Sequence, residues 1–328
     1  MPGKRIPEKR TLLSLGVAVG ALCAIAAVGI FAWSYESGAV YVDEADVVTR
    51  NCCPETQSGP GYGMPTLRVA IAAMISPETT KEYYGDLMRE IGKRLGRRTV
   101  FLQRKTYAEV NHLLEKKEVD LAFVCAGPYV DGNQRFGMEI LAVPVVDGKS
   151  TYRSLTIVHR DSDIRTFDDL KGRRFAFTDP DSNTGHLVPR YVLAQRGATP
   201  ETFFSETFFT NSHDNSIRAV ALGLADGASV DSLVWKFMRD SDSQIAGLTR
   251  VVQESPRYGI PPVVVHPSLA ADTKQQLRET FLNLAQDKKV APLLKKLRID
   301  RFVAGQDGAY DTVRDMQSWV QLQSEPRE

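Results

Sequence analysis

Short apolar runs alternate with amphipathic segments from Thr66 onward, and this alternation constrains the fold more than any other feature of the sequence. Residues 67–72 and 119–124 have the apolar character of buried strands, whereas residues 80–95 and 107–117 have the apolar spacing of helices. Strands joined by helices of this length are typical of parallel βαβ units with helices on both faces of the sheet. The alternation therefore predicts an α/β fold.

The same alternation begins again at Leu155, so the sequence predicts two similar α/β halves. The chain has 328 residues, which is enough for two domains that each bury a core. Further strands are expected at 98–102, 155–159, 174–177, 204–209, 228–230 and 263–265. Further helices are expected after Ser182 and at 213–222, 271–286 and 310–321. In such sheets ligands bind beyond the carboxyl ends of the strands, which is where candidate site residues are to be sought.

An uncharged apolar segment, residues 12–33, precedes this folded part. The segment is long enough to cross a hydrocarbon core of about 30 Å as a helix. Basic residues lie before it and acidic residues after it, so the positive-inside rule places everything after Tyr35 in the periplasm or outside the cell. A cleaved signal peptide is the alternative, although its apolar region is shorter, about 7–15 residues. We expect residues 1–35 to form a cytoplasmic tip and a single-pass anchor in the inner (cytoplasmic) membrane.

Residues 36–65 are rich in Ser, Gly, Pro and acidic residues and show no apolar periodicity, so we expect a linker there. Cys52 and Cys53 lie in this stretch, and their spacing resembles no usual metal-binding pattern. One of the pair could bond to another chain, or both could be ordinary tether residues. The formal net charge of +1 argues against a nucleic-acid partner, because there is no excess of basic residues to neutralise phosphates.

A polar turn after the expected strand at 174–177 is the sharpest local signal of a site. Ser182, Thr184 and Gly185 lie in it and begin a helix. Backbone N–H groups are unpaired at a helix start, and hydroxyl donors beside them make a seat for an anion. The same residue types also serve as ordinary helix caps, and the pattern alone leaves both interpretations open. Pro189 would fall inside a helix that began at Ser182, which predicts an irregular first turn.

Two further polar residues follow expected strands. His213 lies near the start of the helix at 213–222, where its imidazole could donate to an anion or serve as a capping or surface residue. Asp231 follows the strand at 228–230, where its carboxylate could face a cleft or form the turn before the next helix.

Cys125 ends the strand at 119–124 and is a candidate nucleophile. A reactive thiolate needs a base beside it, and no local motif supplies one, which favours a small buried side chain. The sequence contains no HExxH motif, Walker loop or GxSxG motif, and no convincing pair of catalytic carboxylates. We therefore expect a binding protein without catalytic residues, cofactor or metal, and not an enzyme.

Several motifs occur in a fixed order along the chain. They are Tyr107-Ala-Glu, Val119-Asp-Leu-Ala-Phe before Gly127-Pro128, Gly148 with Tyr152, Phe167-Asp-Asp-Leu-Lys-Gly172, Phe177 to Gly185 with Val188-Pro189, Ser212-His213-Asp214, and Val220 to Ala228 with Asp231. Taken together, they resemble the phosphate, phosphite and phosphonate solute-binding proteins of ABC importers, the PhnD-like family. The resemblance extends from about Leu67 to about Phe302 and covers most of the chain.

This resemblance implies a bilobal type II periplasmic-binding fold with two hinge crossings. By analogy, lobe one comprises residues 66–150 and 255–321, lobe two comprises residues 151–254, and residues 322–328 are a tail. The resemblance also implies a ligand site for a small phosphorus oxyanion. Its expected residues are Ser182, Asn183, Thr184, Gly185, His213 and Asp231 from lobe two, with Tyr107 and Tyr129 closing over it from lobe one.

The family implies capture of a phosphonate, phosphite or phosphate for an ABC permease. Two features of the chain depart from the family pattern: the apolar segment at 12–33, and Cys125-Ala126 where an aromatic and small residues are common. The first keeps open a membrane-tethered ligand sensor with a signalling partner. The second keeps open, with less support, an enzyme on the same fold that uses Cys125.

Overall fold

The computed structural model describes residues 41–42, 47–48 and 64–324. The predicted anchor at 12–33 and the pair Cys52 and Cys53 lie outside the described residues. Among the residues that are described, no helix has both the length and the apolar character needed to cross a membrane. Within the predicted linker at 36–65, the structure describes two short strands that pair antiparallel, β1 (Tyr41–Val42) and β2 (Val47–Val48).

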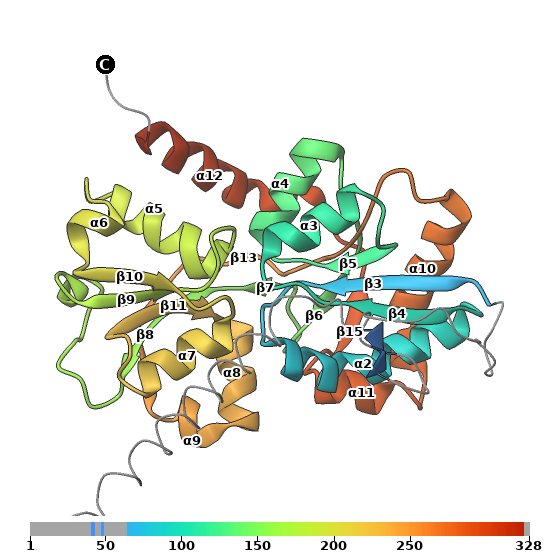
Figure 1. Cartoon of the computed structure of the whole chain (residues 1–328), viewed down its shortest axis with the longest axis horizontal. Helices are drawn as coiled ribbons and strands as arrows, with labels where there is room; N and C mark the ends of the chain where they lie inside the picture. The colour runs from blue at the N-terminus through green and yellow to red at the C-terminus, as the bar shows by residue number, and fades with distance from the viewer. Residues whose placement is uncertain (1–40, 43–46, 49–63, 325–328) are drawn as a thin grey trace, which may run out of the picture. The chain divides into compact units, whose positions relative to one another are not determined.

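The first large sheet has six strands in the order β15-β6-β14-β5-β3-β4 (Figure 1). β3 pairs in parallel with both β4 and β5, whereas β14 and β15 pair antiparallel with their neighbours. We call the part of the molecule built on this sheet lobe one. Its strands are β3 (Thr66–Ile71), β4 (Arg98–Leu102), β5 (Leu121–Phe123), β6 (Glu139–Val145), β14 (Val263–Val265) and β15 (Arg301–Val303).

Helices cover both faces of the six-stranded sheet (Figure 1). One face packs against α3 (Tyr107–Glu115), α4 (Ala126–Phe136) and α12 (Asp311–Ser324). The other packs against α2 (Pro77–Arg94), α10 (Ala271–Asn283) and α11 (Ala291–Lys296). The sheet strands are buried on both sides, which explains why they appear in the sequence as continuous apolar runs.

The second large sheet has five strands in the order β10-β9-β11-β8-β12, and we call the part built on it lobe two. Its strands are β8 (Ser154–His159), β9 (Arg174–Phe177), β10 (Glu206–Phe209), β11 (Gly227–Asp231) and β12 (Thr249–Glu254). One face is covered by α7 (His213–Ala221), α8 (Ser232–Ser241) and α9 (Ser243–Ala246), and the other by α5 (Val188–Ala194) and α6 (Pro200–Phe203).

The chain crosses between the two sheets through β7 (Thr151–Tyr152) and β13 (Tyr258–Gly259), which pair antiparallel with each other. The predicted parallel pairs are present in both sheets, and the strands that follow the crossings pair antiparallel with them. β3, β5, β9 and β11 direct their carboxyl ends toward the crossings, whereas β8 and β14 start there and run the opposite way. Polar residues at the carboxyl ends of strands from both lobes are thereby brought to the same region.

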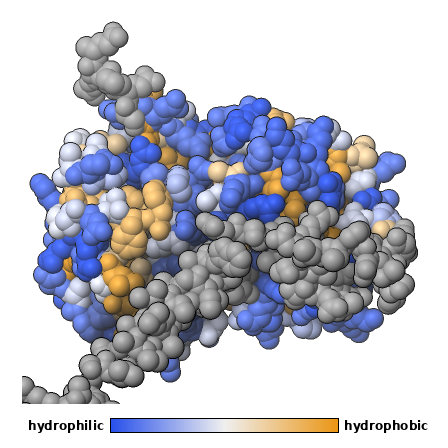
Figure 2. Space-filling model, in the orientation of Figure 1, coloured by the Kyte–Doolittle hydropathy of each residue, from blue (hydrophilic) through white to orange (hydrophobic). Residues whose placement is uncertain are grey.

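The sequence pattern left several elements unassigned, among them β6, β7, β12, β13, β15, α4, α6, α8, α9 and α11. The expected strand at 204–209 begins only at Glu206, because Pro200 and the cap at Thr199 form the short helix α6 before it. The face drawn in Figure 2 is mainly hydrophilic, with hydrophobic residues in smaller groups. Large exposed apolar side chains in lobe two are Phe209, Leu222 and Leu224.

Candidate functional site

An irregular turn follows β9 at the end of lobe two that faces the crossings. Ser182 caps it, and its Oγ accepts a hydrogen bond from the backbone N–H of Gly185 at 3.0 Å. Residues Asn183–Leu187 form one π-helical turn, and α5 begins only at Val188 with Pro189 in its first turn. The irregular turn predicted from Pro189 is confirmed. Proline has no N–H to donate to the carbonyl of Gly185, which accepts from the backbone N–H of Thr178 instead.

Two glycines allow unusually close packing around this turn. A Cβ on Gly185 would lie 2.3 Å from Oγ1 of Thr178, so the turn rests directly on the end of β9. A Cβ on Gly127, at the start of α4 in lobe one, would lie 2.4 Å from the backbone oxygen of Asp181 in lobe two. The absence of side chains at these positions therefore lets the turn, the strand and the opposite lobe meet.

His213 begins α7 and is fully buried. Its Nδ1 accepts a hydrogen bond from the backbone N–H of Asp231 at 3.2 Å and lies 3.0 Å from Oγ1 of Thr178. Burial lowers the pKa of His213 to about 3, so the ring is neutral at ordinary pH. Because Nδ1 accepts, the proton of the neutral ring is on Nε2, which makes Nε2 a hydrogen-bond donor.

Asp231 ends β11 and caps α8, where its carboxylate accepts from the backbone N–H of Leu233 at 2.6 Å. Burial raises the pKa of Asp231 to about 7, against the lowering effect of the backbone N–H groups of Leu233 and Val234. The carboxyl group can therefore accept a hydrogen bond from a protonated oxygen of a ligand, or carry the proton itself.

Tyr107 and Tyr152 contact the irregular turn after β9. Tyr107 begins α3 in lobe one, and its backbone N–H donates to the carboxylate of Asp179 in lobe two at 3.1 Å. Tyr152 lies in the crossing strand β7, and its hydroxyl accepts from Nδ2 of Asn183 at 3.0 Å. In the sequence Tyr152 is part of the Gly148 and Tyr152 motif, but nothing local to it distinguishes it from a core tyrosine.

Tyr129 is not brought together with these residues through its hydroxyl group. It lies on α4, where its hydroxyl donates to the carboxylate of Asp307 at 2.5 Å and its ring packs on Tyr310 with centroids 4.6 Å apart. Both partners belong to lobe one, so Tyr129 supports the packing of α4 there. Tyr129 nevertheless belongs to the same buried cluster as Tyr107 and Tyr152.

Four buried polar atoms of this group have no hydrogen-bond partner among the residues that the structure describes. They are the hydroxyl of Tyr107, Oδ1 of Asn183, Oγ1 of Thr184 and Nε2 of His213. An unsatisfied buried polar group costs about 1–3 kcal/mol, so four of them in residues linked by short contacts indicate a site for a polar ligand. Three can donate to oxygens of an anion, and Oδ1 of Asn183 can accept from a protonated oxygen.

The two lobes are joined by direct hydrogen bonds around the site. The backbone N–H of His213 donates to the carbonyl of Met74 at 3.0 Å, and the backbone N–H of Ser76 donates to Oδ1 of Asp214 at 2.9 Å. Met74 and Ser76 follow β3 in lobe one, whereas His213 and Asp214 begin α7 in lobe two. The lobes are therefore closed on each other, and the site lies between them.

Cys125 lies at the edge of the same group, with its Sγ 3.6 Å from the hydroxyl of Tyr152. Burial raises the pKa of its thiol, which is the opposite of what a reactive thiolate needs. Within the described residues, no cluster of three or more His, Cys, Asp or Glu side chains could hold a metal ion.

Comparison with known proteins identifies similar chains. A family model described as the periplasmic substrate-binding protein of a phosphonate ABC transporter matches residues 69–310. The phosphonates-binding periplasmic protein of Escherichia coli (strain K12) is 24% identical over 262 residues, which cover 78% of this chain and 77% of that protein. A phosphate-import protein of Mycolicibacterium smegmatis is 28% identical over 250 residues, which cover 72% of this chain and 76% of that protein.

Solved structures show the same fold. A binding-protein component of a phosphonate ABC transporter from Pseudomonas aeruginosa has a TM-score of 0.75 at 24% identity, with 79% of this chain and 88% of that chain covered. A binding protein from Prochlorococcus marinus in complex with methylphosphonate has a TM-score of 0.72 at 19% identity, with 78% and 98% covered. The predicted α/β type II periplasmic-binding fold is confirmed, whereas the residue boundaries predicted for the lobes, linker and tail stay predictions.

Proposed function

Because this chain belongs to the family of periplasmic substrate-binding proteins of phosphonate ABC transporters, we propose that Thr184, His213, Tyr107 and Asp231 hold the oxyanion of its ligand between the closed lobes. The chain is an extracytoplasmic substrate-binding protein for a phosphorus oxyanion, as the sequence analysis predicted. The observation that carries the proposed site is the set of four unpartnered buried polar atoms from both lobes. A ligand that pairs with them favours the closed state, because it contacts both lobes only there.

The remaining members of the site position these groups. Ser182 and Gly185 hold the π-helical turn through the hydrogen bond between them, and Asn183 is held by Tyr152. We place Tyr152 in the site in place of Tyr129. Oδ1 of Asn183 and the carboxylate of Asp231 are the hydrogen-bond acceptors of the proposed site. Each can bond to an oxygen of the anion only if a proton lies between the two oxygens. The site therefore fits an oxyanion that carries a proton, such as a phosphonate or phosphate monoanion, better than sulfate, which has no proton to donate at neutral pH.

Replacement of a single donor is the direct test. We expect Thr184→Ala and His213→Ala each to weaken binding by about 1.5–3 kcal/mol, the range for hydrogen bonds to charged groups. The measurement is calorimetric titration of the full-length protein in detergent with phosphate, phosphite, methylphosphonate and sulfate. Thr202→Ala is the matched control, since its hydroxyl lies in the short helix α6 and bonds only to Thr199.

Two outcomes would contradict the proposed site. Unchanged affinity in both variants would mean that the anion lies elsewhere, and no binding of any phosphorus oxyanion by the wild type would remove the proposed function. We also propose that the ligand is bound without covalent change, since burial keeps the thiol of Cys125 neutral. Mass spectrometry of the ligand released after incubation therefore returns the compound that was added.

We further propose that residues 12–33 form an uncleaved anchor that keeps this domain beside its permease. The support is the length of the uncharged apolar segment and the charge asymmetry around it. The expected result is an intact N-terminus, found by mass spectrometry of protein extracted from membranes. A mature chain that starts after residue 33 would show a cleaved signal peptide instead.

A further inference from the structure

Two aspartates of lobe two accept hydrogen bonds from backbone N–H groups at helix starts of lobe one. Asp179 follows β9, and its Oδ2 accepts from the N–H of Tyr107, the first residue of α3, at 3.1 Å. Asp214 lies in the first turn of α7, and its Oδ1 accepts from the N–H of Ser76, which caps α2, at 2.9 Å. Both aspartates are buried, with 1% and 5% of their surface exposed. Because α3 and α2 cover opposite faces of the lobe-one sheet, one contact is made on each side of that sheet.

The N–H groups that receive these contacts have no partner within their own helices. The first N–H groups of a helix lack an intrahelical acceptor. In α3 the capping box of Thr106 and Glu109 satisfies the N–H groups of these two residues and leaves that of Tyr107 for the other lobe. In α2 the N–H of Ser76 is likewise left for the other lobe. Both hydrogen bonds therefore form only when the lobes close.

Each aspartate is linked in the chain or by a hydrogen bond to donors of the proposed oxyanion site. Asp179 holds the N–H of Tyr107, whose hydroxyl is one of the four unpartnered polar atoms. Asp179 also precedes the turn that carries Thr184. Asp214 directly follows His213, whose Nε2 is another of the four. The two contacts therefore fix donors of lobe one relative to donors of lobe two.

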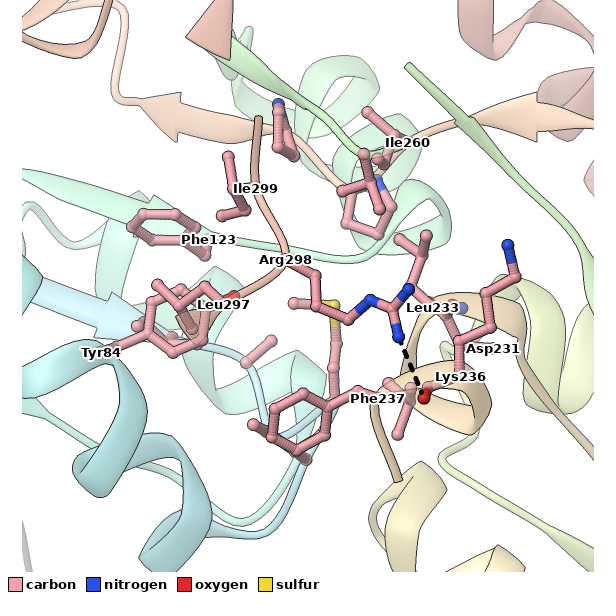
Figure 3. A pocket seen from close by; sticks show the side chains of 18 residues that line it. Tyr84, Phe123, Asp231, Leu233, Lys236, Phe237, Ile260, Leu297, Arg298 and Ile299 are labelled. Atoms are coloured by element: carbon pink, nitrogen blue, oxygen red, sulfur yellow. Dashed lines mark hydrogen bonds between the residues drawn. The ribbon is translucent and has the colours of Figure 1, made fainter. Parts of the chain in front are cut away.

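Ion pairs between the lobes are more exposed than these aspartates. A cavity of about 110 Å³ lies between the lobes beside Asp231, so their side chains do not pack directly on each other there (Figure 3). Arg298 lines this cavity from lobe one and donates to the carboxylate of Asp240, and Lys236 of α8 donates to Asp147 at 3.1 Å. These four charged side chains are partly exposed. Exposed ion pairs stabilise little, whereas hydrogen bonds to buried carboxylates are stronger.

We propose that Asp179 and Asp214 are positioning residues for ligand capture, which hold the lobes closed by accepting from the helix starts of lobe one. This inference rests on the proposed function, because closure matters to affinity only if the ligand lies between the lobes. Neither aspartate is one of the groups that we place against the ligand. Their effect on binding comes through the closed state, which the ligand and the two contacts stabilise together.

Each aspartate also has a local role that is the same in the open and closed states. Oδ1 of Asp179 accepts from the N–H of Asp181 at 2.8 Å and forms a turn, and Asp214 places a negative charge at the start of α7. A local role contributes to the stability of the ligand-free protein. A contact across the lobes contributes to ligand affinity, so the two measurements separate the roles.

Asp179→Asn separates the two roles at the first position. Asparagine keeps one oxygen for the N–H of Asp181 and so keeps the turn, but its NH₂ group would face the N–H of Tyr107. Two donors then oppose each other only when the lobes are closed. We expect phosphate and methylphosphonate to bind about ten-fold to a hundred-fold more weakly to the full-length protein, through faster dissociation. Thermal unfolding without ligand should match the wild type.

Asp214 should respond to asparagine in the opposite way. Its contact with Ser76 uses Oδ1, and an asparagine can turn its single oxygen to this N–H. Asp214→Ala is expected to weaken binding by about the same factor as Asp179→Asn, and Asp214→Asn to recover most of the loss. If only the charge at the start of α7 mattered, both variants would lower ligand-free stability and neither would change affinity, which would overturn the inference.

Calorimetric titration and ligand-free thermal unfolding of the same samples complete the test. Asp226→Ala is the matched control, because the carboxylate of Asp226 accepts from the backbone N–H of Arg174 within lobe two. Its removal should lower the unfolding temperature and leave affinity unchanged. Wild-type affinity in Asp179→Asn and Asp214→Ala would overturn the inference while the proposed function stands. If no phosphorus oxyanion binds to the wild type, the proposed function is wrong and this inference falls with it.

Discussion

Gly127→Ala is expected to lower ligand affinity by about a hundred-fold or more while leaving the ligand-free fold intact. The new Cβ would lie 2.4 Å from the backbone oxygen of Asp181 and 3.4 Å from the backbone nitrogen of Asn183, both in the opposite lobe. Neither backbone atom can move aside as a flexible side chain would, so the clash opposes closure. A cost of roughly 3 kcal/mol on the closed state reduces the apparent affinity by about this factor.

Calorimetric titration and thermal unfolding of the same samples check this expectation. Gly85→Ala is the matched control, because a Cβ on Gly85 in α2 meets nothing within 4 Å. The variant Gly127→Ala should unfold like the wild type without ligand and gain less stability from it. Wild-type affinity in Gly127→Ala would show that the ligand-bound lobes stay further apart than in the closed structure described here.

Asp231→Asn is expected to make the ligand-free protein more stable than the wild type above pH 7. Burial raises the pKa of Asp231 from its ordinary value to about 7, so the folded protein holds a proton that the unfolded chain releases at lower pH. The stability from this proton is fully present below about pH 4 and is lost as the pH rises to about 7. The free energy involved is roughly 4 kcal/mol, and an uncharged asparagine avoids the loss.

Unfolding in denaturant from pH 4 to pH 8 measures the effect. The two proteins should be close in stability at pH 4 and diverge toward pH 8, whereas Asp163→Asn, at an exposed carboxylate, should follow the wild type throughout. Parallel curves for wild type and Asp231→Asn would mean that Asp231 titrates normally. With ligand, Asp231→Asn should bind sulfate more tightly than the wild type does, because it no longer places a carboxylate against an anion without a proton.

The irregular turn at Ser182, which we propose as the anion site, could be predicted from the sequence because the interactions that form it are local. Ser182 caps a backbone N–H three residues ahead, and Pro189 removes the N–H that would otherwise bond to the carbonyl of Gly185. The positions of His213 and Asp231 could be predicted for a similar reason, since His213 lies a few residues after β10 and Asp231 ends β11. Residues placed by strand ends and caps depend on neighbours only a few positions away.

The hydrogen-bond partners of Tyr129 and Tyr152 could not be predicted in this way. The direction of Tyr129 depends on Asp307, which is 178 residues further along the chain. The contact of Tyr152 with Asn183 depends on how the crossing strand meets the turn of lobe two. β8 and β14 were predicted as strands, but their antiparallel direction was not, because strand direction follows from the path between the lobes and leaves no mark on the apolar pattern.

The sequence by itself determined the α/β class, the two halves and the polar residues at the strand ends, because these follow from apolar spacing and local capping. The tertiary structure decided which polar atoms are left unpartnered, how closely Gly127 lets the lobes approach, and that a cavity adjoins Asp231. These features depend on contacts between segments far apart in the chain, whose geometry is set only when the two lobes pack together.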